Sequence, residues 1–253
     1  MTAHPAKFSD VILERVVEVF HAFGWPQRVL DPFAGTGKIH AITQGRTTVS
    51  VGVEIEPEWA TMHPRTIVGD ALALPFPDAS FDALCTSPCY GNRLADHHEA
   101  KDGSRRHSYR HVLGRALHPN SSGRLQWGEQ YRAFHEAAWT ESLRVLKPDA
   151  LVILNSSNHV RNGQEQFVTE WHTNFFLDHG CAVLDFDTVN TRRLRHGANY
   201  TVRARYENVA AFRYVAPVFT PDDIEEDRHD SDHARERSEL GGDVDASEGA
   251  RRP

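Results

Sequence analysis

The sequence predicts an α/β fold in which a mostly parallel, seven-stranded sheet is covered by helices on both faces and ends in an antiparallel strand. Two observations predict this fold. Short runs rich in β-branched and apolar residues alternate along the chain with segments of helical periodicity, which is the pattern of a parallel sheet with crossover helices. The loops with unusual composition follow the ends of strands. In such sheets those loops gather at one edge, where ligands bind.

The first part of the chain alternates expected helices and strands. Residues 10–23 repeat apolar side chains at helical spacing, and Ser9 or Asp10 is a suitable N-terminal cap. Pro57 is typical of the first turn of a helix, and Gly45 is typical of a helix end. The expected helices are 10–23, 38–44 and 57–62, and the expected strands are 28–31, 48–54, 66–70 and 81–86.

A long polar stretch, 92–128, precedes the second part of the chain. The clearest helix follows it, because Tyr131, Trp139 and Leu143 share one face and Pro148 stops the pattern. The expected helices are 129–146 and 164–177, and the expected strands are 150–155, 181–189 and 206–215. A hairpin through 190–205 makes the last strand antiparallel and brings that loop to the same sheet edge.

Composition divides the chain into a body, 1–215, and an acidic tail, 216–253. The tail carries 12 acidic and 5 basic residues and almost no large apolar side chain, so we expect it to be disordered, either simply solvated or binding a partner. It accounts for the whole net charge of −7. The body is therefore formally neutral, and the acidic total does not argue against a nucleic-acid partner.

The remaining totals concern the compartment. Three cysteines are too few for a disulfide framework in a chain of this length and suggest a reducing environment. No apolar run approaches the ~18 residues of a membrane span, and the first residues have no signal-peptide core. We expect a soluble cytoplasmic protein with no membrane partner.

The segment from Asp31 to Gly37 is the first candidate ligand loop. It follows an apolar strand, and its glycines allow a tight turn and a close backbone approach to a ligand. The G-x-G-x-x-G of a dinucleotide site is absent. A nucleotide-phosphate loop is also excluded, because Pro32 stands where its first glycine is required and Ile39 replaces the serine or threonine.

Four motifs occur in a fixed order: LDPFAGTGK at 30–38, VGVEIEP at 51–57, VGDA at 68–71 and TSPCYG at 86–91. This series resembles the class I S-adenosylmethionine-dependent methyltransferases, and most of all the DNA amino-methyltransferases of the N6-adenine and N4-cytosine type. The resemblance covers about residues 4–215. It implies a Rossmann-like class I methyltransferase fold with S-adenosyl-L-methionine as cofactor.

The resemblance also implies a cofactor site. Gly35 and Gly37 would approach the methionine part, Glu54 would accept the ribose hydroxyls, and Asp70 would accept from the adenine amino group. Glu56 is an alternative ribose partner. The segment before Asp10 resembles the family's additional N-terminal cofactor motif. The implied cofactor-binding residues are Lys7, Phe8, Asp31, Phe33, Ala34, Gly35, Thr36, Gly37, Glu54, Asp70 and Ala71.

The implied catalytic residues are Ser87, Pro88 and Tyr90. The lone pair of an exocyclic amine is delocalised into the ring, so acceptors at its hydrogens are needed to free it. Ser87 and the Pro88 carbonyl would be those acceptors, and Tyr90 would stack on a base turned out of its helix. Cys89 stands where the family has a second proline. A nucleophilic cysteine of the C5-cytosine type is the alternative reading, but no acidic partner motif accompanies it.

Two basic stretches are candidate contacts to nucleic acid. The insertion 91–128 combines arginines with aromatic residues, which suits phosphate contacts and base stacking. The loop 190–205 adds arginines without an acidic residue. The candidate residues are Arg93, Arg105, Arg106, Tyr109, Arg110, Arg193, Arg195 and Asn199. Five histidines in the insertion match no standard metal-site spacing, so no metal is expected.

The sequence therefore predicts an enzyme that methylates an exocyclic amino group of a base in DNA. Two alternatives stay open. One is an RNA base methyltransferase of the guanine-N2 type, and the other is a non-catalytic relic of the fold that binds nucleic acid or protein.

Overall fold

The computed structural model describes residues 4, 8–95, 108–191 and 204–215. Its main sheet has seven strands in the order β3-β2-β1-β4-β5-β9-β8. Strands β1 to β5 pair in parallel, and β9 is antiparallel to both of its neighbours. The strands are β1 (Arg28–Asp31), β2 (Val49–Glu54), β3 (Thr66–Val68), β4 (Phe81–Thr86), β5 (Leu146–Ser156), β8 (Cys181–Asn190) and β9 (Tyr206–Tyr214). The predicted fold class is confirmed.

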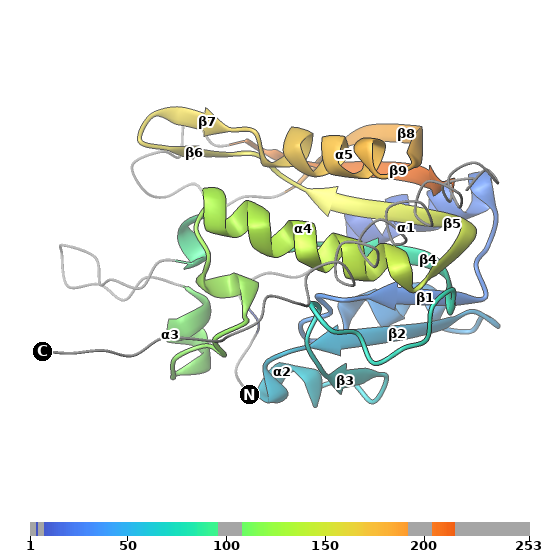
Figure 1. Ribbon diagram of the computed structural model, residues 1–253, viewed down its shortest axis with the longest axis horizontal. Coiled ribbons are helices and arrows are strands. Elements are labelled where there is room, and N and C mark those ends of the chain that lie inside the picture. Colours follow the sequence, from blue (N-terminus) through green and yellow to red (C-terminus); the bar gives the residue numbers. More distant parts are fainter. Residues whose placement is uncertain (1–3, 5–7, 96–107, 192–203, 216–253) are drawn as a thin grey trace, which may run out of the picture. The chain divides into compact units, whose positions relative to one another are not determined.

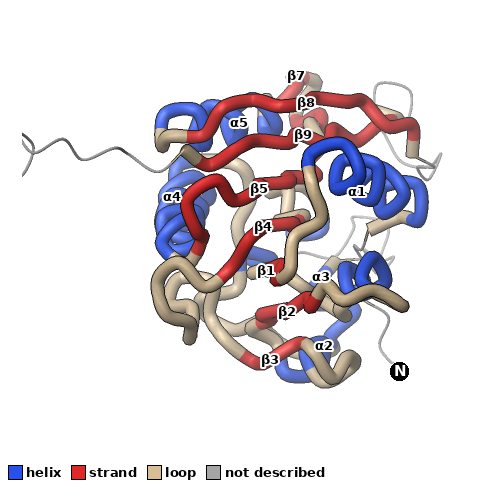
Figure 2. The backbone as a smooth tube through the Cα atoms, turned by 90° about the vertical axis from the view of Figure 1, so that its right-hand side faces the viewer, coloured by secondary structure: helices blue, strands red, loops and turns tan. Residues whose placement is uncertain are grey.

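Helices cover both faces of this sheet. Figure 2 shows α4 and α5 on one side and α1 on the other. The α-helices are α1 (Asp10–Phe23), α2 (Pro57–Ala60), α3 (Tyr109–Leu113), α4 (Glu129–Arg144) and α5 (Val168–Asp178). Three short 3₁₀ helices are η1 (Lys38–Thr43), η2 (Arg93–Ala95) and η3 (Ser122–Arg124), and a small hairpin consists of β6 (His159–Arg161) and β7 (Gln164–Gln166).

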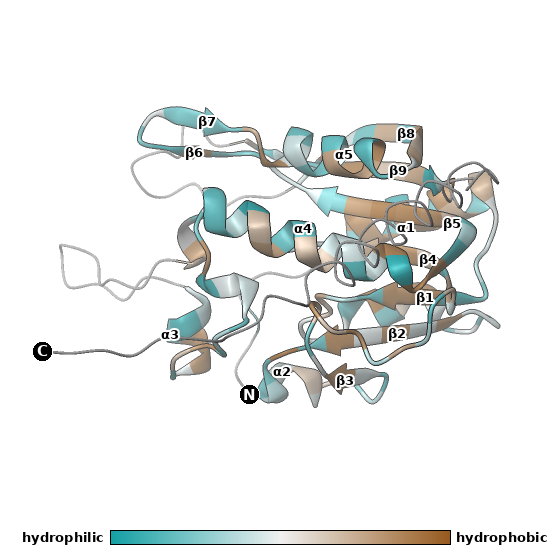
Figure 3. Ribbon diagram, in the orientation of Figure 1, coloured by the Kyte–Doolittle hydropathy of each residue, from teal (hydrophilic) through white to brown (hydrophobic). Residues whose placement is uncertain are grey.

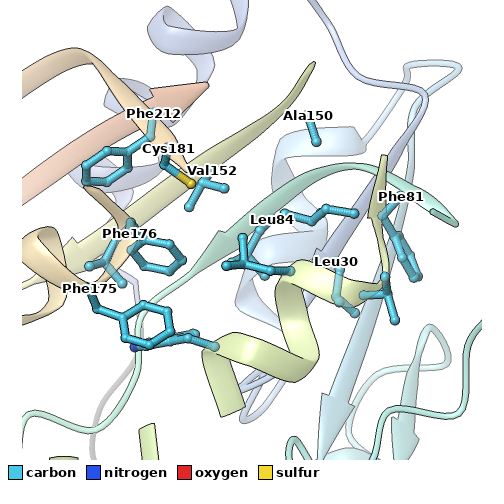
Figure 4. Packing of buried hydrophobic residues seen from close by; sticks show 14 of the residues in the cluster. Leu30, Phe81, Leu84, Ala150, Val152, Phe175, Phe176, Cys181 and Phe212 are labelled. Carbon is cyan, nitrogen blue, oxygen red and sulfur yellow. The ribbon is translucent and has the colours of Figure 1, made fainter. Parts of the chain in front are cut away.

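Strand alternation divides the core into two layers. Leu84 belongs to the cluster with α4 and α5, whereas its neighbours Ala83 and Cys85 belong to the cluster with α1. Figure 4 shows the first layer, where the Phe176 ring packs against Phe212 with a centroid distance of 5.6 Å. The central strands are correspondingly rich in apolar residues, which Figure 3 shows in brown. Burial on both faces explains why these strands read as continuous apolar runs.

Helix α1 begins where the sequence predicts, because the Ser9 side chain accepts a hydrogen bond from the Ile12 amide at 3.4 Å. Its residues Ile12, Val16 and Phe20 are fully buried. They lie at positions i, i+4 and i+8 and form one apolar stripe against the sheet.

Three predicted elements differ from the observed ones. The segment 38–44 forms a 3₁₀ helix rather than an α-helix. Strand β5 starts at Leu146 instead of residue 150 and passes through Pro148. The predicted helix 164–177 is wrong at its start, because Asn162 and Gly163 have φ of 52° and 75° and join β6 to β7 in a tight hairpin. An Asn-Gly pair is a typical hairpin signal, and α5 starts only at Val168.

The parallel strands end at one edge, on the left of Figure 1, towards which the arrowheads of β2 and β5 point. The loops after these strands therefore share that edge. In the described part of the chain, no helix is long and apolar enough to cross a membrane. The predictions for the tail, 216–253, lie outside the described residues.

Candidate active site

A cavity of about 650 Å³ lies at the carboxyl ends of the parallel strands. The loop after β1 contributes Asp31 to Thr36 to its wall, and the loop after β4 contributes Ser87 to Tyr90. Glu54 and Ala71 line it from the ends of β2 and β3, and Glu207 lines it from β9. The structure thus brings the predicted cofactor loop and the predicted catalytic loop to the same cavity.

The loop after β1 is held from inside by Asp31. This buried carboxylate accepts hydrogen bonds from the Phe33 amide at 3.0 Å and from the Thr86 hydroxyl at 2.7 Å. Gly35 and Gly37 have φ of 52° and 75°, a region that favours glycine. A Cβ on Gly35 would lie 3.3 Å from the His4 ring, so this part of the wall is bare backbone packed under a ring.

Glu54 ties the ends of β1 and β2 together. One of its carboxylate oxygens accepts from the Gly35 amide and the other from the Glu56 amide, both at 2.9 Å. Each oxygen keeps a second lone pair, so Glu54 can also accept from a ligand hydroxyl. Glu56 is fully buried, accepts from the His118 amide at 2.7 Å and faces Arg115 at 2.8 Å. Of the two candidate ribose partners, Glu54 is the one that lines the cavity.

Asp70 is placed differently from the prediction. Its carboxylate accepts from the Leu72 amide at 2.9 Å and from the Asn120 side chain at 2.7 Å, and it is not among the residues that line the cavity. Asn120 and Ala71 line that wall instead. Asp70 thereby links the insertion to the sheet edge, and its role toward the cofactor adenine stays a prediction.

The N-terminal segment also reaches the cavity. Phe8 lines it and is 6% exposed. The His4 ring contacts Trp59 edge-to-face with a centroid distance of 4.3 Å. This placement agrees with an additional N-terminal motif near the ligand loop. Lys7 lies outside the described residues.

A polar cluster occupies the catalytic end of the cavity. The Ser87 and Tyr90 hydroxyl oxygens lie 2.9 Å apart. The Asn155 side-chain nitrogen lies 3.2 Å from the Ser87 oxygen, 3.0 Å from the Tyr90 oxygen and 2.7 Å from the Glu207 carboxylate, so its two protons are shared among three acceptors. Tyr90 also donates to Glu207 at 3.3 Å. The predicted serine and tyrosine are thus joined by two residues that the sequence analysis missed.

The missed residues follow from the sheet. Asn155 lies near the end of β5, and Glu207 lies near the start of the antiparallel β9. Strand β9 enters the sheet at the edge where β5 leaves it, and Asn155 pairs with Val209 in the ladder. A polar residue at the end of a buried strand was the available signal for Asn155. No local signal distinguishes Glu207.

A buried hydrogen-bond chain fixes the catalytic loop at Cys89. The Trp139 indole donates to His172 Nδ1 at 2.9 Å, so the proton of the neutral imidazole is on Nε2. That nitrogen lies 2.9 Å from the Tyr131 hydroxyl, which donates to the Cys89 carbonyl at 2.5 Å. Burial holds the pKa of His172 well below its usual range. The neutral ring and its directed hydrogen bonds hold the loop in place at Cys89.

Burial also sets the protonation of the acidic groups and the thiol. Burial raises the pKa of Asp31 to about 7, although the hydrogen bonds from Thr86 and Phe33 act to lower it. Burial also raises the pKa of Glu54 to about 7, although its two amide donors act to lower it. It raises the pKa of the Cys89 thiol as well. A thiol of raised pKa is a poor nucleophile at neutral pH, which disfavours the alternative with a nucleophilic cysteine.

The candidate nucleic-acid residues are only partly described. Arg110 is exposed on α3. Tyr109 is 4% exposed and clusters with Trp59 and Leu117, so its ring is not free to stack on a nucleic acid at the surface. It lines the cavity instead. Arg93 lies in η2, and the other predicted contacts lie outside the described residues: Arg105, Arg106, Arg193, Arg195 and Asn199.

No protein-family model and no curated protein matches the chain in sequence. Among solved structures, a SAM-dependent methyltransferase from Methanosarcina mazei is similar with 14% identity, over 78% of this chain and 97% of that chain, at a TM-score of 0.51. The 1,6-didemethyltoxoflavin-N1-methyltransferase from Burkholderia thailandensis, whose structure holds S-adenosylhomocysteine, is 16% identical over 80% and 78% of the two chains, with a TM-score of 0.47.

A SAM-dependent methyltransferase from Aquifex aeolicus is 14% identical over 83% of this chain and all of that one, with a TM-score of 0.44. The likeness to the Methanosarcina protein establishes the fold, so the chain has the fold of SAM-dependent methyltransferases. None of these three structures is described as a DNA amino-methyltransferase.

Proposed function

We propose that this protein is an S-adenosylmethionine-dependent methyltransferase that methylates an exocyclic amino group of a base in DNA. One observation carries the proposal. The glycine loop after β1 and the Ser87–Tyr90 loop after β4 line a single cavity, so a methyl donor and an acceptor group can meet there. The fold and the ordered motifs support the donor, and the type of catalytic loop supports the acceptor.

The cavity suits the cofactor in size, shape and charge. Its volume of about 650 Å³ is within the range of ligand pockets. Gly35 lines the cavity with backbone alone, in a conformation with φ of 52° that favours glycine. The cofactor carries a sulfonium and an ammonium group, and two buried carboxylates, Asp31 and Glu54, line the cavity. The residues that would hold it are the loop 31–37, Glu54, Ala71 and Phe8.

When bound, S-adenosylmethionine supplies an electrophilic methyl group on sulfur. The protein's own part is to bind the acceptor amine, orient it and take its proton. Ser87 is half-buried and lines the cavity, so its oxygen can accept a hydrogen bond from the amine and localise the nitrogen lone pair. Tyr131 holds the loop carbonyl at Cys89. This restraint keeps the serine in place during transfer.

The polymer is inferred from charge and from the motif type. The basic residues of the insertion suit phosphate contacts, and Arg110 is exposed beside the cavity-lining Tyr109. Arg115 does not support this role, because it pairs with Glu56 and Glu58 at 2.8 and 2.5 Å.

The test is methyl transfer from labelled S-adenosylmethionine to DNA and to RNA of mixed sequence, measured separately. We expect label in DNA with the wild type and with Thr47→Ala, an exposed control, and a loss of about 100-fold or more with Ser87→Ala. Label in RNA alone would identify the RNA alternative. Cofactor binding without transfer to either polymer would contradict the proposal, and no cofactor binding would indicate a relic.

A further inference from the structure

Glu207 brings a carboxylate to the catalytic end of the cavity. Because β9 is antiparallel, this residue near its start lies beside the ends of the parallel strands. Its Oε2 accepts from Asn155 at 2.7 Å and from the Tyr90 hydroxyl at 3.3 Å. The resemblance assigns this position no role, and 117 residues separate it from Tyr90 along the chain.

The acceptor-only Glu207 carboxylate fixes the direction of the two hydrogen bonds that it receives. A carboxylate only accepts, so the side-chain nitrogen of Asn155, not its oxygen, must face Glu207. Tyr90 has a single hydroxyl proton, which it gives to Glu207. The 2.9 Å contact between the Ser87 and Tyr90 oxygens allows either direction, and with the tyrosine proton on Glu207 it is donated by the serine hydroxyl. The resulting order runs from Ser87 through Tyr90 to Glu207.

This order determines what Ser87 offers to a ligand. Its proton is directed to Tyr90, and one of its lone pairs receives the bond from Asn155 at 3.2 Å. The remaining lone pair is an acceptor. A serine hydroxyl alone is a weak base, but a carboxylate two hydrogen bonds away gives the proton a stable destination.

We propose that Glu207 is the terminal proton acceptor of a relay from Ser87 through Tyr90, a proposal that rests on the methyl transfer proposed above. In the transfer step a bond forms between the substrate nitrogen and the methyl carbon, and the carbon–sulfur bond breaks with its electron pair going to sulfur. The nitrogen proton passes to Ser87 Oγ, the serine proton passes to Tyr90, and the tyrosine proton passes to Glu207. The products are the methylated amine, the thioether and a neutral Glu207.

Glu207 differs in its hydrogen-bond partners from Asp31 and Glu54, two other carboxylates that line the cavity. Asp31 and Glu54 are engaged by backbone amides and by Thr86. Glu207 is engaged by the side chains of the catalytic cluster. We therefore assign Glu207 as a positioning and proton-accepting residue that acts through Tyr90, not as a cofactor ligand.

Kinetics of three variants test the assignment. Glu207→Gln and Tyr90→Phe should each lower kcat by about 100-fold while the Kd for S-adenosylmethionine stays within about twofold of the wild type. Glu207→Asp should recover part of the rate, and Glu136→Gln, an exposed control on α4, should leave it unchanged. An unchanged kcat in Glu207→Gln, or a parallel loss of cofactor affinity, would overturn the relay.

A second measurement is independent of turnover. In protein labelled with ¹³Cζ-tyrosine, the resonance missing from Tyr90→Phe reports the Tyr90 hydrogen bond. It should move in Glu207→Gln and stay in place in Glu136→Gln. If no polymer accepts a methyl group, the proposed function fails while this shift still tests the hydrogen-bond order. An unmoved Tyr90 resonance overturns the relay whether or not transfer occurs.

Discussion

Replacing Tyr131 by phenylalanine removes the hydroxyl that joins His172 to the Cys89 carbonyl and leaves the ring in place. The ring contacts with Trp127 and His135, at centroid distances of 5.2 and 4.1 Å, are kept. The lost bonds are 2.9 and 2.5 Å long. Both the tyrosine and His172 are fully buried, so the imidazole N–H is left without a partner in the described part of the chain.

The magnitude follows from those two groups. A buried polar group that loses its partner costs about 1–3 kcal/mol. His172 should bear such a cost in full, whereas the Cys89 residue is partly exposed and its carbonyl can recover a water. We therefore expect Tyr131→Phe to lower the free energy of unfolding by about 2–4 kcal/mol. For a body of this size that corresponds to a fall in Tm of about 5–12 °C.

The assay is denaturant unfolding with a thermal melt, run beside Tyr214→Phe. Tyr214 is partly buried, and its hydroxyl has no hydrogen bond among the described residues, so its loss should change stability by about 0.5 kcal/mol or less. In the proposed reaction Tyr131→Phe should also lower kcat more than it weakens cofactor binding. Equal stability of the two variants, with equal kcat, would refute the view that this chain fixes the catalytic loop.

Three further predictions concern the cavity and its wall. Burial raises the pKa of Asp31 and of Glu54 to about 7, above the ordinary 3.8 and 4.5. Between these values the folded protein without ligand binds more protons than the unfolded chain, so its Tm should fall as pH rises from about 4 to 7. Because a cationic ligand favours the ionised carboxylates, calorimetric affinity for S-adenosylmethionine should rise over the same window, and a flat profile would contradict this. Arg115→Ala leaves the buried Glu56 carboxylate without its ion pair, so proteolysis within the insertion should quicken, while a Glu136→Gln control, exposed on α4, resists as the wild type does. Gly52→Ala places a Cβ 2.6 Å from the Ala34 side chain in the loop after β1, so it should lower both Tm and cofactor affinity. If neither value falls, the loop moves aside without cost and the prediction is wrong.

Local patterns predict much of the fold. Helix α1 and strand β1 have the predicted limits, because a capping serine and an apolar run flanked by polar residues are signals carried by a few neighbouring residues. The β6–β7 hairpin was missed even though its Asn-Gly turn is a local signal, because the following amphipathic segment was extended too far towards the N-terminus. In this segment the turn signal at Asn162 and Gly163 competed with the helical periodicity that follows it.

The candidate site is less accessible to sequence reasoning. The two loops that follow β1 and β4 could be placed together, because the carboxyl ends of parallel strands share an edge. Asn155 and Glu207 meet only through the antiparallel pairing of β9 with β5, across 52 residues of chain. Burial removes the Tyr109 ring from the surface, and a hydrogen bond joins Asp70 to Asn120 in the insertion. These contacts join residues that are distant in the sequence, so motif spacing cannot predict them.

The central claim is that the loop after β1 and its neighbours bind S-adenosylmethionine. Calorimetric titration of the cofactor into the wild type, Gly35→Trp and Gly45→Trp tests it most directly. Both glycines have positive φ, of 52° and 72°, but Gly35 lines the cavity whereas nothing lies within 4 Å of a Cβ on Gly45. We predict saturable binding to the wild type and to Gly45→Trp, and affinity at least about tenfold weaker for Gly35→Trp. Absence of binding to the wild type, or equal binding to all three proteins, would contradict the claim.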